Sequence, residues 1–265
     1  MKGAWILLSA WLVASGVLSQ ETHPVGDSRQ DVGYAAKIET VRRAGEGDLP
    51  ALYDMVRTAG AAYGLNTAQE RSLVNEALNR IRQLGGGGLG LEDMLEGVAK
   101  DPSRDPGVRE YALQHLYLWY PDSGKKGDIE RVFWEMADGS ILASVSLLYL
   151  HRLDSKGNIK GGNKLDAAIL KVMGMTGLRD ADKITLMAVA SERNLKKALP
   201  TILEWARGPG WLVTVAATDA IGWLGDEDDL AYLKEDVAIQ DIREGKAAMA
   251  RAEKRMAMRM EGSKQ

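Results

Sequence analysis

Residues 49–56 read LPALYDMV, and the spacing of their apolar side chains decides the fold class. Leu49, Leu52, Tyr53 and Val56 occupy positions i, i+3, i+4 and i+7, which lie on one face of an α-helix. The same spacing begins again at Leu91, Ile129, Leu165, Leu199 and, in a weaker form, Leu230. Successive copies begin 42, 38, 36, 34 and 31 residues apart. The chain therefore repeats one helical unit six times.

Partner helices are predicted between these copies. Their apolar residues follow a second spacing, i, i+4, i+8 and i+11, which begins at Leu73, Val108 and Val213. Asp48, Asp128 and Asp229 each precede a copy of the first spacing, where a carboxylate caps free backbone N–H groups. A helix pair that recurs about every 30 to 40 residues is typical of an α-solenoid, whose neighbouring pairs share one core.

Several segments resemble HEAT-like repeats of the short bacterial, PBS-lyase type. DPGVREYALQHL (105–116) and VAATDAIGWLGDEDDLAYLKE (215–235) resemble its first helix, tight turn and second helix, and GDLPALYDMV (47–56) and KALPTILEWA (197–206) resemble its second helix. The resemblance covers roughly residues 30 to 237. It implies an all-α, right-handed α-solenoid of about six helix pairs plus a C-terminal helix. As to function, it implies only the usual role of such solenoids, which is protein binding or scaffolding. It implies no specific activity, because one fold hosts many activities.

The ends of the chain predict two further segments. Residues 1–19 have the pattern of a secretory signal peptide, with Lys2, an apolar run from Ala4 to Leu18, and Ser19 before the expected cleavage point. The run is shorter than the roughly 20 residues of a membrane-spanning helix, which favours cleavage over a retained anchor. We therefore expect an exported protein, periplasmic or extracellular, with the solenoid at 20–240 and a basic, methionine-rich helix at 241–265.

The glycine run before Leu91 matches a dinucleotide-binding loop only in its spacing. Gly85, Gly87 and Gly90 stand in the order G-x-G-x-x-G, which needs a strand before it and an acidic residue on a later strand. An amphipathic helix pattern precedes it instead. We predict a hinge between two helices, with no nucleotide.

Catalytic and metal-binding motifs were not found, and we predict no enzyme activity, cofactor or metal. The three histidines, His23, His115 and His151, are too scattered for a metal site, and His115 is expected at the surface of a helix. The acidic run 226–229 is interpreted as a helix cap rather than a cation site. Without its first 19 and last 25 residues the chain is net acidic by seven, which argues against nucleic acid as a partner.

The repeated second helices offer the candidate binding surface. Six residues lie beside their apolar stripes, namely Asp54, Glu96, Trp134, Glu135, Glu204 and Trp205. Tryptophans among carboxylates suit a protein or peptide partner with basic and apolar residues. The alternative is that both tryptophans only pack against the adjacent repeat.

Two further alternatives remain open. Tyr117, Trp119 and Tyr120 would stack on sugar rings if the chain were a carbohydrate-binding module or an all-α carbohydrate-active enzyme of the cell envelope. The C-terminal helix places Met249, Ala252, Met256 and Met260 on one face, with Arg251, Lys254, Arg255 and Arg259 around it. This helix would either contact a membrane surface or a partner's groove, or cap the last repeat.

Overall fold

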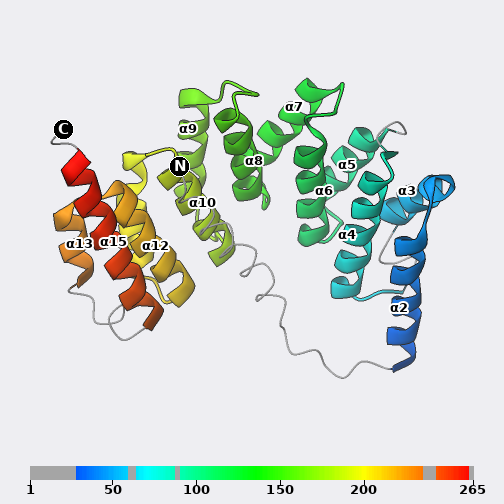
Figure 1. The fold of residues 1–265 in the computed structure, drawn as a ribbon, viewed down its shortest axis with the longest axis horizontal. Helices are drawn as coiled ribbons and strands as arrows, with labels where there is room; N and C mark the ends of the chain where they lie inside the picture. Colours follow the sequence, from blue (N-terminus) through cyan, green and yellow to red (C-terminus); the bar gives the residue numbers. More distant parts are fainter. Residues whose placement is uncertain (1–27, 59–63, 87–89, 235–242, 263–265) are drawn as a thin grey trace. The chain divides into compact units, whose positions relative to one another are not determined.

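Every regular element that the structure describes is a helix, so the predicted all-α class is confirmed (Figure 1). In this computed structural model the described residues are 28–58, 64–86, 90–234 and 243–262. The predicted signal peptide and His23 lie outside these ranges. Within them, no helix has both the length and the apolar character needed to cross a bilayer.

The described residues form two compact units that divide after Met136. The first contains helices α2 (Ser28–Arg43), α3 (Leu49–Thr58), α4 (Thr67–Gln83), α5 (Leu91–Lys100), α6 (Pro106–Trp119) and α7 (Lys126–Ala137), the last of which ends at the boundary. Helix α4 packs against α2, α3 and α6, and α5 packs against α3 and α6. Fully buried side chains such as Leu73, Ile81, Leu95 and Phe133 form the core.

The second unit begins at Ala137. It contains helices α8 (Ala143–Ser155), α9 (Gly162–Met173), α10 (Asp180–Glu192), α11 (Leu199–Ala206), α12 (Trp211–Leu224), α13 (Glu227–Lys234) and α15 (Arg243–Gly262). Helix α10 packs against α8, α9 and α12, and α12 also contacts α11, α13 and α15. In chain order, the helices from α2 to α13 stand where the first and second helices of the six predicted pairs are expected, and α15 follows them.

The six predicted apolar stripes coincide with α3, α5, α7, α9, α11 and α13, and most of their side chains are buried. The predicted caps need a correction. The side chains of Asp48 and Asp229 were expected to accept N–H groups of the residues that follow them. Each instead accepts the N–H of the residue three positions earlier, Gly45 at 2.8 Å and Asp226 at 2.9 Å. The cap of α13 is Asp226, which accepts the N–H groups of Asp228 and Asp229.

Ion pairs link helices that are one repeat apart within each unit. Arg42 pairs with Glu76, Glu70 with Arg104, and Arg71 with Asp105, at 2.7, 3.2 and 2.5 Å. Each of these pairs spans 34 residues. In the second unit, Asp219 of α12 accepts hydrogen bonds from Arg251 and Arg255 of α15, which lie 32 and 36 residues later. The charges therefore recur with the period of the apolar stripes.

Helix α15 is docked on α12 rather than separate from the helix pairs. Ala248, Ala252 and Met256 are buried, and Arg259 donates to the carbonyl of Gly225 at 2.5 Å. The structure thus places the tail where the capping alternative puts it. Met249 is only partly buried, and the side chain of Met260 is not described.

The glycine run connects two helices, α4 and α5. Gly85 and Gly90 adopt positive φ values of 66° and 75°, which favour glycine. A Cβ on Gly86 would lie 2.8 Å from a methyl carbon of Leu49, and the Gly86 carbonyl accepts the buried hydroxyl of Tyr53. Tight turns and close packing therefore account for the glycines that the structure describes; residues 87–89 lie outside it.

Candidate functional site

Two of the predicted site residues, Glu96 and Glu135, lie together across α5 and α7. Lys100 donates to Glu96 at 2.6 Å and pairs with Glu135 at 2.5 Å, and Arg131 bonds both carboxylates at 3.2 and 3.0 Å. Burial raises the pKa of Glu96, but the hydrogen bonds from the two cations outweigh it and lower the pKa. The same two cations lower the pKa of Glu135. Arg131 also pairs with Asp128 at 3.6 Å, so three carboxylates and two cations form this cluster, and each of its charges already has a partner.

The other predicted residues are divided between the units. Asp54 is exposed on α3 and Trp134 is half-buried on α7, both in the first unit. Glu204 is exposed and Trp205 is half-buried, both on α11 in the second unit. The structure therefore brings Glu96 near Glu135 and leaves Glu204 beside a separate surface.

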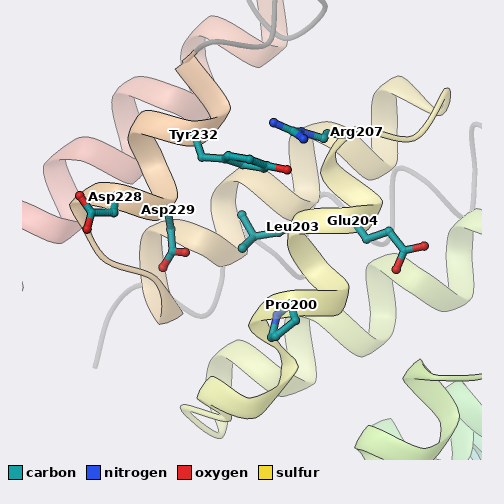
Figure 2. Close-up of a pocket in the computed structure, with 7 residues that line it drawn as sticks. All are labelled: Pro200, Leu203, Glu204, Arg207, Asp228, Asp229 and Tyr232. Carbon is teal, nitrogen blue, oxygen red and sulfur yellow. The ribbon is translucent and has the colours of Figure 1, made fainter.

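That surface is an open groove between α11 and α13, the second helices of consecutive pairs (Figure 2). Its volume is about 580 Å³. The lining residues are Pro200, Leu203, Glu204 and Arg207 from α11 and its end, and Asp228, Asp229 and Tyr232 from α13. In Figure 2 Leu203 lies between the two helices, with Asp229 on the α13 side. This size falls within the range of small-ligand sites, about 300–1,000 Å³.

The groove joins an aromatic ring, an apolar floor and unpaired carboxylates. The guanidinium carbon of Arg207 lies 3.4 Å from the centre of the Tyr232 ring, a cation–π contact. The carboxylates of Glu204 and Asp228 have no ion pair or hydrogen-bond partner within the described part of the chain. Burial raises the pKa of Asp229, as do the neighbouring charges of Asp226 and Asp228, against the hydrogen bond from the Asp226 N–H.

The sequence prediction included Glu204 but missed the rest of the groove. Tyr232 lies between the stripe residues Leu230 and Leu233 of α13, and is 42% exposed. Like the predicted tryptophans, it is an aromatic residue outside the apolar stripe of its helix, although at a different position of the repeat, and this was the signal available. Within the acidic run, Asp226 performs the predicted capping, whereas Asp228 and Asp229 line the groove, which the prediction of a cap did not include.

His115 is buried, at 3% exposure, so the expectation of a surface position is wrong. Helix α6 packs against both α4 and α5, and positions outside its predicted stripe are covered as well. Burial, with a smaller contribution from the charge of Arg82, lowers the pKa of His115 to about 4. The imidazole is neutral at pH 7.

This burial predicts a pH-dependent stability. The unfolded chain takes up a proton at His115 near pH 6.5, whereas the folded chain does so only near pH 4. Between these values the unfolded state binds more protons, so acidification from pH 6.5 to 4 costs about 3 kcal/mol of the free energy of unfolding at this residue. Urea unfolding at several pH values between 6.5 and 4 measures this change in the free energy of unfolding. The decrease should be about 3 kcal/mol smaller in His115→Gln than in the unmodified chain. An equal dependence of the free energy of unfolding on pH in the two proteins would contradict the prediction.

A second buried histidine sits in a structural ion-pair network. His151 Nε2 lies 2.8 Å from Glu192, and its Nδ1 lies 3.3 Å from the Ser155 hydroxyl. This order resembles part of a catalytic triad, but Arg193 Nη1 is 3.5 Å from the same Nδ1 and binds Asp154. Ser155 is also the last residue of α8, where the helix dipole opposes a developing oxyanion. The arrangement gives no support to hydrolysis.

The aromatic residues proposed to bind sugars make bonds within the chain. Trp119 Nε1 donates to Glu92 at 3.2 Å, and the buried Tyr120 donates its hydroxyl to Glu130 at 2.6 Å. Burial raises the pKa of Tyr120, and so does the hydrogen bond to Glu130. Nothing in this geometry favours a sugar-stacking platform over a structural role.

Known proteins and metal chemistry supply no further assignment. Over the ranges that the structure describes, no three or more His, Cys, Asp or Glu side chains gather closely enough to hold a metal ion. Comparison with protein-family profiles, curated proteins and solved structures found no match for the chain.

Proposed function

We propose that this chain is a non-catalytic binding or scaffold protein that holds a protein or peptide partner on its second helices. The observation that carries the proposal is the groove between α11 and α13, where carboxylates without partners adjoin apolar surface. At protein interfaces, buried apolar and aromatic contacts supply most of the affinity, and complementary charges beside them add specificity and speed association. The cluster on α5 and α7 contributes less, since its charges already have partners.

The proposal includes a right-handed α-solenoid of HEAT-like helix pairs and export from the cell. Six consecutive helix pairs and ion pairs one repeat apart support the solenoid, because stacked repeats contact only their neighbours. The signal-like first 19 residues support export. The arginines of α15 already bond to α12, so we assign the tail a capping role and no membrane contact.

The test is affinity capture with the full chain as bait, using an envelope extract of the source organism at moderate salt. We expect one protein to be retained in stoichiometric amount. Cross-linking with mass spectrometry should place it on the second helices, α3, α5, α7, α11 and α13. Retention of glycan fragments alone would instead support the carbohydrate-binding alternative, and cross-links confined to the first helices would contradict the proposed surface.

A further inference from the structure

We infer that the groove between α11 and α13 binds a cationic, partly apolar peptide segment of the partner. Glu204 and Asp228 receive its basic side chains, and Leu203, Pro200 and Tyr232 receive an apolar side chain between them. This inference rests on the proposed function and specifies the site and the chemistry of the partner.

Charge complementarity identifies the partner as cationic. The groove contains Glu204, Asp228 and Asp229 against one guanidinium, that of Arg207, and it therefore carries about two net negative charges at neutral pH. The cluster on α5 and α7 provides an internal comparison, because each of its carboxylates, Glu96, Asp128 and Glu135, pairs with a cation. A segment with two lysines or arginines would give the carboxylates of the groove the same kind of partner.

The apolar part of the groove sets the second requirement. Leu203 is only partly buried, and Tyr232 exposes 42% of its surface. Arg207, which is exposed and stacks on Tyr232, demonstrates that this ring accepts a guanidinium. A peptide that places an apolar side chain on Leu203 removes this apolar surface from water, which favours binding. A purely ionic ligand gains none of this.

The experiment begins with an array of ten-residue peptides. Each carries two lysines or arginines around one leucine or phenylalanine, at sequence separations from one to four. Matched peptides replace the basic residues with glutamate or the apolar residue with serine. The full chain is expected to retain a subset of the basic and apolar peptides at least tenfold better than both matched forms. The binding should weaken in 0.5 M NaCl. Retention of no peptide, or equal retention of the serine forms, overturns the inference.

Two groove variants then locate the site by fluorescence anisotropy with the best peptide. Glu204→Gln combined with Asp228→Asn is expected to raise the Kd tenfold or more, and Tyr232→Ala to raise it severalfold. Glu227→Gln is the matched control, because Glu227 is exposed in the first turn of α13 but does not line the groove. An equal rise of the Kd in the control would mean that the peptide responds to the overall negative charge and not to the groove, and would overturn the inference.

The outcomes separate this inference from the proposed function. If the double variant still captures the envelope partner, that partner binds elsewhere, and the groove assignment fails while the proposed function stands. If the variant converts a dimer into a monomer in sedimentation experiments, a second copy of this chain occupies the groove, and the peptide assignment fails. If the full chain captures no protein and retains no peptide, both fail.

Discussion

Replacing Gly222 with alanine is expected to lower the free energy of unfolding of the second unit and loosen α15 from α12. An alanine Cβ at this position would lie 2.6 Å from the Cα of Ala252 and 2.8 Å from its Cβ. The nearest obstructing atom is backbone and the other is a Cβ, which has no rotamers, so only a shift of the helix can relieve the contact. Overpacking of this kind costs about 1–3 kcal/mol. Gly222→Leu, which adds more atoms to the same contact, should separate the two helices.

Trypsin digestion measures the release directly, since α15 carries six lysine and arginine residues. Two of them, Arg251 and Arg255, bond to Asp219 in the docked helix. Gly97→Ala is the matched control. Gly97 lies inside α5 with nothing within 4 Å of an added Cβ, so alanine there should raise stability by up to about 1 kcal/mol. If Gly222→Ala is as resistant to trypsin as the unmodified chain, and as stable, the close contact between α12 and α15 is wrong.

The helices were predictable from the sequence because their buried residues are apolar and recur with the period of a helix. Leu49, Leu52 and Val56 recur at helical spacing, and equivalent sets mark the second helix of each pair. The burial of His115 was not predictable in this way, since it follows from the packing of both α4 and α5 on α6. An apolar stripe identifies the face of a helix that packs on one neighbour and does not reveal a second face that packs on another.

The charge state of the candidate surface was only partly predictable. Glu96 with Lys100, and Arg131 with Glu135, are each four residues apart, the spacing of ion pairs within a helix. The prediction of an acidic surface did not use this signal. The pairing of Lys100 with Glu135 joins two helices and could not be derived from local spacing. The groove could not be predicted from local spacing either, since Arg207 and Tyr232 meet only when α11 and α13 pack on α12.

Phe133→Ala is expected to lower the free energy of unfolding of the first unit by about 3–5 kcal/mol, the usual cost of removing a buried aromatic ring. Phe133 is the only phenylalanine of the chain and is fully buried. Its neighbour Trp134 is half-buried on the same helix, α7, so Trp134→Ala should cost clearly less despite the larger side chain. Urea unfolding followed by circular dichroism compares the two losses.

The comparison also decides between the two interpretations of Trp134. A small loss of stability, together with weaker capture of the partner, would place this ring on the binding surface. A loss as large as that of Phe133→Ala would assign Trp134 to the core, and only the groove between α11 and α13 would then remain as the recognition surface. In either case the two substitutions remove aromatic rings from adjacent positions of one helix, so helix propensity differs little between them and the difference measures burial.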